Sequence, residues 1–134
     1  MAATLYKQFQ RLTPQEQSYL RSRPYHAFAI QAARDTAYKE TQRRFGRNGH
    51  NDRSDAFRHC YWSALLAREL GFQDALKFTT AHEAFPANPP AEKTMDIHNN
   101  RIGLDIGRVK GTDQALSMRC MAALQAGKLK IMVK

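Results

Sequence analysis

Hydrophobic residues recur along this chain at the three- and four-residue spacing of amphipathic helices, and turn-forming residues separate the segments. The first segment begins with Thr13-Pro14, a capping pattern that a glutamate three residues after the threonine completes, and it ends at Pro24. The pattern predicts helices over about 14–23, 24–45, 54–70, 73–84, 91–109 and 113–126. Residues 128–134 alternate apolar and polar side chains, which indicates either a short strand or a tail docked on the helices.

The segment at about 54–70 is apolar on nearly all sides, and such a helix belongs at the centre of a fold. The connections between segments are short, and 134 residues suit one domain. We therefore expect an all-α, compact single-domain bundle of about six helices around this central helix. The domain is expected to span 1–134, with a motif-bearing core at about 45–108.

Charge is distributed unevenly along the chain. Lys and Arg number 21 against 12 Asp and Glu, a net charge of +9. Residues 1–53 carry 10 basic and 4 acidic side chains, residues 54–105 carry 5 and 7, and residues 106–134 carry 6 and 1. The two basic ends predict an anionic partner, such as nucleic acid, a membrane surface or a cell-wall polymer. No apolar run reaches the about 20 residues of a membrane span, so no stable membrane insertion is expected.

The two cysteines do not form a disulfide framework. Cys60 and Cys120 each fall in an apolar segment, which favours buried free thiols and leaves a single bridge open. No CxxC pair occurs, so a zinc ribbon or a thioredoxin-like motif is excluded.

Two predicted helices carry a histidine together with an acid. Asp55 and His59 lie four residues apart on the central helix, where both can bind one metal ion or the acid can orient the ring. The alternative is that Asp55 is only a first-turn acid and His59 a hydrogen-bonded core histidine. His82 and Glu83 end the next predicted helix, just before a proline-rich loop at 85–90, and a His ligand beside a Glu ligand or general base serves metal-dependent hydrolysis.

A third polar row lies on one face of the segment 91–109, at Asp96, Asn99, Asn100, Gly103 and Gly107. Asn and Gly are poor helix formers, so this face contradicts helix propensity. The glycines allow close approach of another backbone or a ligand, and the polar groups beside them need partners. Alternatively, Asp96 and the asparagines tie down the proline-rich loop by hydrogen bonds.

Short loops make these helices antiparallel neighbours, so the three polar rows can converge on one buried pocket. The expected ligands of a divalent metal ion, Zn²⁺ or Ca²⁺, are four: His59, His82, Asp96 and Asp55. Catalytic roles are expected for four more residues: Glu83, Arg58, Asn99 and Asn100. In this interpretation Glu83 accepts the proton of a metal-bound water, and either Arg58 or the pair Asn99 and Asn100 stabilises the developing anion.

Three motifs resemble an uncharacterised bacterial domain family: NDxxDAFRHxYWSALLA at 51–67, AHE at 81–83 and MDxHNNxxG at 95–103. The resemblance implies an all-helical domain found alone or at the end of secreted toxin-like proteins. It further implies a bacterial effector or toxin setting, with a possible cognate immunity protein as partner and delivery by a secretion system. The N-terminus lacks a signal-peptide core, so synthesis in the bacterial cytoplasm without a cleavable signal is expected.

A weaker likeness is to the HD-type metal phosphohydrolases. His59 and the His82-Glu83 pair are similar to their helix-borne His and adjacent His–acid pair, with Asp96 as last ligand. The chain departs from that pattern because it has Glu where Asp is expected and because Asp96 follows the pair too closely. The likeness therefore implies a similar ligand geometry only.

The favoured function is a small metal-assisted hydrolase acting on an anionic substrate: a cell-envelope polymer, a lipid or a phosphodiester. Polar rows on the most buried helix are costly to keep for structure alone, which favours an enzyme. A metal-free version would use Glu83 as general acid on a glycan, with Asp55 or Asp96 as partner. The alternative class is a non-enzymatic basic module for nucleic acid or a protein partner, in which Arg43, Arg44 and Arg47 contact phosphates.

Overall fold

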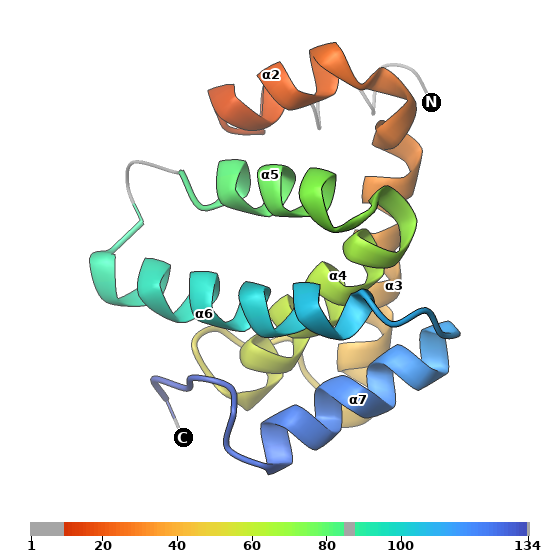
Figure 1. The fold of residues 1–134 in the computed structure, drawn as a ribbon. Helices are drawn as coiled ribbons and strands as arrows, with labels where there is room; N and C mark the ends of the chain where they lie inside the picture. Colours follow the sequence, from red (N-terminus) through yellow and green to blue (C-terminus); the bar gives the residue numbers. More distant parts are fainter. Residues whose placement is uncertain (1–9, 85–87, 134) are drawn as a thin grey trace.

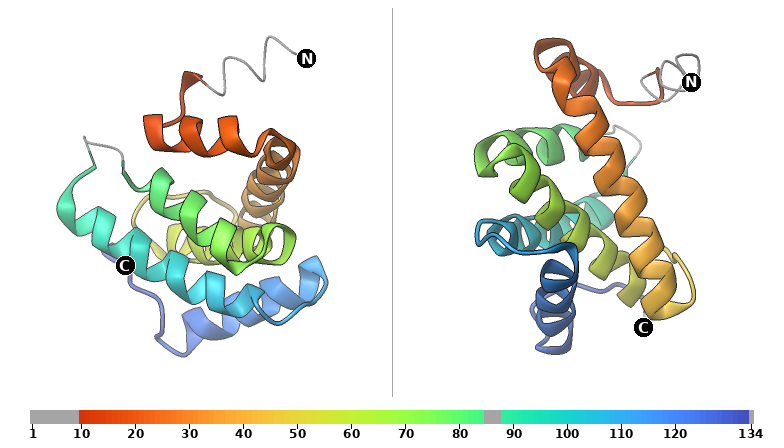
Figure 2. Two further views of the ribbon diagram at one scale, coloured as in Figure 1. Left: turned by 45° about the horizontal axis from the view of Figure 1, so that its top comes forward. Right: turned by 90° about the vertical axis from the view of Figure 1, so that its right-hand side faces the viewer.

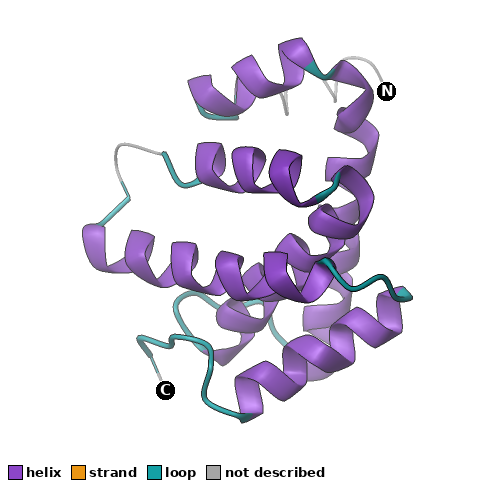
Figure 3. Ribbon diagram, viewed as in Figure 1, coloured by secondary structure: helices purple, strands orange, loops and turns teal. Residues whose placement is uncertain are grey.

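Helices account for all the regular structure in the described parts of the chain, residues 10–84 and 88–133 of a computed structural model (Figures 1 and 3). Six α-helices and one 3₁₀ turn follow one another in these ranges: α2 Pro14–Ser22, η1 Pro24–His26, α3 Ala27–Phe45, α4 Arg53–Leu70, α5 Phe72–His82, α6 Pro90–Gly107 and α7 Asp113–Gln125. The all-α prediction is confirmed, and no described helix is long and apolar enough to cross a membrane.

Local sequence signals set most of the helix boundaries. Thr13 caps α2 as expected, since its hydroxyl accepts from the Glu16 amide and the Glu16 carboxylate accepts from the Thr13 amide in return. Pro24 begins a 3₁₀ turn, so the long helix that follows begins three residues later than predicted. Asp52 caps α4, one residue before the helix begins. Its carboxylate accepts from the Asp55 amide, whereas the Ser54 hydroxyl donates to Asp52.

The central position of α4 is confirmed. Twelve of its 18 residues are buried, and it packs against α3, α5, α6 and α7 (Figures 1 and 2). Helix α6 comes especially close because its face toward α4 carries glycines. A Cβ on Gly103 would lie 2.1 Å from the Cys60 carbonyl oxygen, and one on Gly107 would lie 2.2 Å from that of Ala64. The predicted close backbone approach at these glycines is therefore confirmed.

The C-terminal tail docks on the helices, as one of its two predicted forms requires. Among the described residues, none after α7 belongs to a strand. The tail is held by polar contacts: His98 bonds the Lys128 carbonyl, and the Met132 and Val133 amides both donate to the Asn51 carbonyl. The tail thus connects α6 with the loop that precedes α4.

Helix α5 ends at His82, two residues before its predicted end, and Glu83 is its C-cap. Helix α2 packs on α5 on the side away from α6 (Figure 1). Residues 85–87 of the proline-rich loop lie outside the described residues. The fold thus brings α2, the end of α5, the start of α4 and the middle of α6 around one polar region.

Candidate functional site

Three side chains from three different helices converge beside the start of α4. His59 comes from α4, Glu83 from the C-cap of α5 and Asp96 from α6. Each offers one nitrogen or oxygen atom, and these atoms all lie within 4.8 Å of one another. His59 Nε2 lies 3.5 Å from Asp96 Oδ1. The predicted convergence of the three polar rows is therefore realised by one residue from each row, which we call the His59–Glu83–Asp96 cluster.

Two polar atoms of this cluster are buried without a hydrogen bond to any described residue: His59 Nδ1 and Asp96 Oδ1. The other buried unpartnered atom of the described residues, Asn51 Oδ1, belongs to a neighbouring loop. Leaving a buried polar group unsatisfied costs about 1–3 kcal/mol. These atoms therefore need partners that the described residues do not supply, such as water or an ion.

The charge state of the cluster follows from its burial and from its neighbours. Burial lowers the pKa of His59 to about 4, so its imidazole is neutral at neutral pH and keeps a lone pair for a ligand. Burial, followed by the charges of Glu83 and Asp55, raises the pKa of Asp96 to about 7. Burial likewise raises the pKa of Glu83. The raised pKa values mean that the environment of Asp96 and Glu83 disfavours their negative charges, since no cation among the described residues outweighs the effect of burial.

Asn100 orients Glu83 rather than facing a substrate. Its Nδ2 donates to Glu83 Oε2 at 2.8 Å, and its Oδ1 accepts from the Ser63 hydroxyl at 3.2 Å. All three side chains are buried. Both ends of the Asn100 amide are engaged by these two side chains, and its role in stabilising an anion stays a prediction.

Asn99 lies in the same predicted row but serves the tail. Its Nδ2 donates to the Lys130 carbonyl at 3.0 Å, and its Oδ1 accepts from the Lys130 amide at 2.8 Å. Asn99 is fully buried. It therefore acts as a structural clamp on the tail, and both ends of its amide are engaged there. A catalytic role for Asn99 stays a prediction.

His82 is drawn away from the cluster by a residue that the sequence did not indicate. Its Nδ1 lies 2.9 Å from Glu16 Oε2, across the contact between α2 and α5. Burial lowers the pKa of His82, but the hydrogen bond and charge of Glu16 outweigh it and leave that pKa raised. His82 is not among the three clustered residues, and Glu83, predicted as the general base, lies there instead. The metal-ligand role of His82 stays a prediction. The only sequence signal for Glu16 was its place in the capping pattern of α2.

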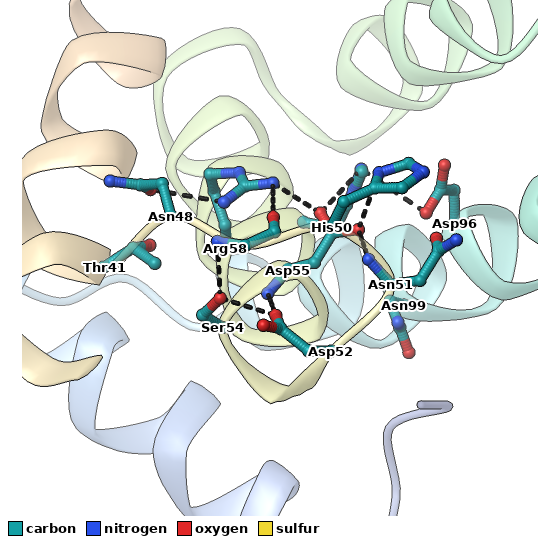
Figure 4. A network of polar contacts seen from close by, with 12 residues as sticks. Thr41, Asn48, His50, Asn51, Asp52, Ser54, Asp55, Arg58, Asp96 and Asn99 are labelled. Carbon is teal, nitrogen blue, oxygen red and sulfur yellow. Dashed lines mark hydrogen bonds and ion pairs between the residues drawn. The ribbon is translucent and has the colours of Figure 1, made fainter. Parts of the chain in front are cut away.

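Asp55 supports the cluster from outside. One of its oxygens accepts from Arg58 at 2.6 Å and the other from the Asn51 amide at 2.6 Å (Figure 4). The first oxygen lies 3.8 Å from His59 Nε2. Asp55 is therefore the centre of a loop network beside the His59 ring and is not one of the three clustered residues. Its role as a metal ligand stays a prediction.

The loop before α4 contributes residues that sequence reasoning missed. Asn51 has a left-handed backbone, with φ of 62°, and its Nδ2 donates to Glu92 at 2.6 Å. His50 Nε2 also lies 3.0 Å from this Glu92 oxygen. The sequence signal for this loop was an asparagine close to glycines, since Asn tolerates a left-handed backbone better than most residues.

A cavity of about 160 Å³ adjoins the cluster and shares His59 as part of its wall. Apolar side chains, among them Ile30, Trp62 and Phe78, line it together with Arg34 and Arg58. Arg58 thus keeps a place beside the site, although its guanidinium also bonds the Gly49 carbonyl. Both arginines lie within 5.0 Å of the centre of the Tyr38 ring.

The basic run predicted for the non-enzymatic alternative is largely neutralised within the fold. Arg43 and Arg44 both pair with Glu40, at 2.6 and 3.2 Å. Arg47 pairs with Asp52 at 3.0 Å. These arginines are therefore not arranged as a free phosphate-contacting row.

Comparison with known proteins gives the chain a family. No solved structure matches it. A family model described as Domain of unknown function (DUF6973) matches residues 17–128, a range that contains His59, Glu83 and Asp96 together with the helices that carry them. Because the match covers well over half of the sequence, this chain is a member of that family of helical domains, DUF6973.

Proposed function

We propose that the chain is a metal-assisted hydrolase whose divalent cation is held by His59, Glu83 and Asp96. The observation that carries the proposal is the convergence of three potential ligand atoms within 4.8 Å of one another, in a cluster that also holds the unpartnered Asp96 Oδ1. A dication would satisfy that oxygen and compensate the two carboxylates that burial holds close together. His59 Nε2 and Asp96 Oδ1, 3.5 Å apart, are separated by about the distance between two donors of one zinc ion.

The ligand set favours Zn²⁺ over Ca²⁺. One imidazole and two carboxylates match the nitrogen and oxygen ligands of catalytic zinc sites, which keep a further position for water. Ca²⁺ instead takes six to eight oxygen ligands. With three protein ligands, the ion would retain room for a water molecule and for a substrate oxygen.

Neighbouring residues would support the reaction in distinct ways. A bound Zn²⁺ lowers the pKa of its water toward neutrality. Asn100 engages only Oε2 of Glu83, so Oε1 stays available for the ion or for the proton of that water. Arg58 would stabilise negative charge at the cavity side of His59. Asp55 would fix Arg58 and the loop around it.

The substrate would be anionic, and the setting would be that of a bacterial effector or toxin. The net charge of +9 and the basic ends of the chain support an anionic substrate, drawn in by long-range attraction. The setting is supported by the resemblance of the three motifs to domains of secreted toxin-like proteins. It implies delivery by a secretion system and a cognate immunity protein as partner.

Metal binding is the first test. Purified protein is stripped with a chelator and titrated with Zn²⁺ by calorimetry. We expect His59→Ala, Glu83→Gln and Asp96→Asn each to lose more affinity than the roughly 10–100-fold lost when only a partner of a metal ligand is removed. Asn100→Leu, which removes such a partner, should fall within that range. Glu69→Gln and Asp105→Asn are matched controls, because both acids are exposed and lie outside the cluster.

Protein stability provides a second measurement for any variant that folds poorly. A ligand that binds only the folded state raises its stability. Zn²⁺ should therefore raise the thermal midpoint of the wild type and of the two control variants. Failure of Zn²⁺ and Mn²⁺ to bind or stabilise the wild type would contradict the proposal. Metal-dependent cleavage of bis(p-nitrophenyl) phosphate, lost in Asp96→Asn, would support the hydrolase directly.

A further inference from the structure

The cavity beside His59 has two chemically different walls. Ile30, Trp62 and Phe78 form apolar surface, contributed by α3, α4 and α5. Arg34 and Arg58 form a basic side near the Tyr38 ring. A pocket with apolar walls and a few placed charges is typical of sites for small molecules.

The basic side is prepared for an anion. The hydrogen bonds of Arg58 use both hydrogens on Nη2 and one on Nη1, so its Nε–H and second Nη1 hydrogen are not engaged by the described residues. Arg34 is more exposed and pairs with Asp35 only at 3.9 Å. The one acid lining the cavity, Glu16, is already paired with His82. Guanidinium groups with free donors suit phosphate or carboxylate oxygens.

The volume limits the size of the apolar group. An apolar cavity of about 150 Å³ is large enough to hold one benzene molecule. The cavity here, about 160 Å³, therefore accepts about one aromatic ring or a short alkyl chain. Several sugar rings of a cell-wall polymer do not fit inside it.

We infer that this cavity binds a small phosphate monoester or diester, with its apolar group against Trp62 and Phe78 and its phosphate at Arg58 beside His59. This inference rests on the proposed function for the bond that is cleaved, since His59 borders both the cavity and the cluster. The assigned reaction is hydrolysis: water adds to phosphorus, the P–O bond to the apolar alcohol breaks, and that alcohol leaves with one proton. Binding in the cavity does not itself require the metal.

Trp62 supplies the measurement, because it is the one tryptophan of the sequence and lines the cavity. Chelator-treated protein is titrated with phenyl phosphate while tryptophan fluorescence is recorded. We expect saturable binding that is tighter than binding of inorganic phosphate, of phenol or of benzylamine. Equal binding of phenol would overturn the role of the arginines, and equal binding of inorganic phosphate would overturn the role of the apolar wall.

Matched variants separate the two walls. Arg34→Gln should weaken phenyl phosphate binding by about two- to fivefold, since the side chain is partly exposed. Arg58→Gln should weaken it by about 10- to 100-fold. Lys39→Gln, an exposed residue of α3 outside the cavity, should change nothing. Ile30→Phe should block the cavity, whereas Ile97→Phe, on the exposed surface of α6, should leave binding intact.

The outcomes distinguish this inference from the proposed function. One outcome is that phenyl phosphate binds equally to the wild type and to Asp96→Asn while the protein binds no Zn²⁺. This result would confirm binding in the cavity and contradict the proposed hydrolase. Zn²⁺ binding without selective phenyl phosphate binding would overturn the cavity assignment and leave the metal centre standing. Thermal unfolding of each variant shows whether lost binding reflects lost folding. If a variant unfolds, a competition experiment with wild-type protein takes its place. Phenyl phosphate and hexyl phosphate are expected to displace each other from the cavity.

Discussion

Asn99 and Lys130 form a closed pair in which both amide atoms of the asparagine bond the main chain of the lysine. Nδ2 donates to the Lys130 carbonyl at 3.0 Å, and Oδ1 accepts from the Lys130 amide at 2.8 Å. The tail so held reaches the Asn51 carbonyl, and the Asn51 amide in turn donates to Asp55. The tail therefore supports the loop beside the cluster, although no tail residue belongs to the cluster itself.

Removing this clamp should loosen the tail without changing the His59–Glu83–Asp96 cluster. Asn99→Ala deletes two hydrogen bonds, each with a net worth of about 0.5–1.5 kcal/mol, so a loss of about 1–3 kcal/mol of unfolding free energy is expected. Urea denaturation measures it, and hydrogen exchange should show faster exchange at residues 128–133. Asn48→Ala, an exposed loop substitution, is the control. Unchanged exchange in the tail would show that the pair does not hold it.

The close approach of α6 to α4 predicts an unequal response of two glycines. Gly103→Ala places a Cβ 2.1 Å from the Cys60 carbonyl oxygen, which is backbone and can move only with the helix. We expect a loss near the upper end of overpacking penalties, about 3 kcal/mol. Gly111→Ala meets the Ala115 side chain at 3.2 Å, so a much smaller change is expected. Similar denaturation midpoints for the two variants would contradict this reading of the helix interface.

The thiols of Cys60 and Cys120 should be unreactive while the protein is folded. Cys60 and Cys120 are free and fully buried, with their sulfur atoms 3.2 Å apart. The hydrogen bond to Cys120, together with burial, raises the pKa of Cys60, and a thiol without thiolate character reacts slowly. Ellman's reagent should label neither thiol in native protein and both in urea. A single bridge, which the sequence left open, would instead leave both unlabelled in urea.

The sequence was sufficient for the elements and for the centre of the fold, because those depend on periodicity and local caps. The all-round apolar pattern placed α4 at the centre, and the glycines of α6 predicted its close approach. Boundaries shifted where two signals competed. Ser54 and Asp52 both suit a cap, and their geometry, in which the serine donates to the aspartate, decides between them.

The site was predicted only in part. Helix periodicity shows on which face of a helix a residue lies, but it does not show which residue of another helix it contacts. His59 and Asp96 were predicted to share a site and do lie together, but the third residue of the cluster is Glu83 and not His82. His82 instead pairs with Glu16, 66 residues away in sequence. Asn99 and Asn100 shared a row but met different neighbours, the tail and Glu83. Such pairings arise only when separate helices pack together.

Acid stability should report on Glu40, which connects α3 with α7. The Arg43 guanidinium that donates to Glu40, together with the Ser117 hydroxyl, lowers the pKa of this carboxyl from 4.5 to about 2. Ser117 lies on α7 and its hydroxyl also accepts from Arg44, so the charged carboxylate helps hold the two helices together. The protonated form cannot accept from Arg43 as strongly, and it weakens this contact.

A lowered pKa in the folded state gives stability that is complete above the unfolded pKa and is lost as pH falls through the folded one. The contribution of Glu40 should therefore be full above about pH 5 and should disappear progressively toward pH 2. In urea titrations at several pH values, the wild type should exceed Glu40→Gln in unfolding free energy at neutral pH, and this difference should shrink between pH 5 and 2. Asp35→Asn, whose carboxylate makes only a 3.9 Å contact on the surface, should follow the wild type throughout. A difference between wild type and Glu40→Gln that stays constant across this range would mean that the carboxylate charge does not hold α3 against α7.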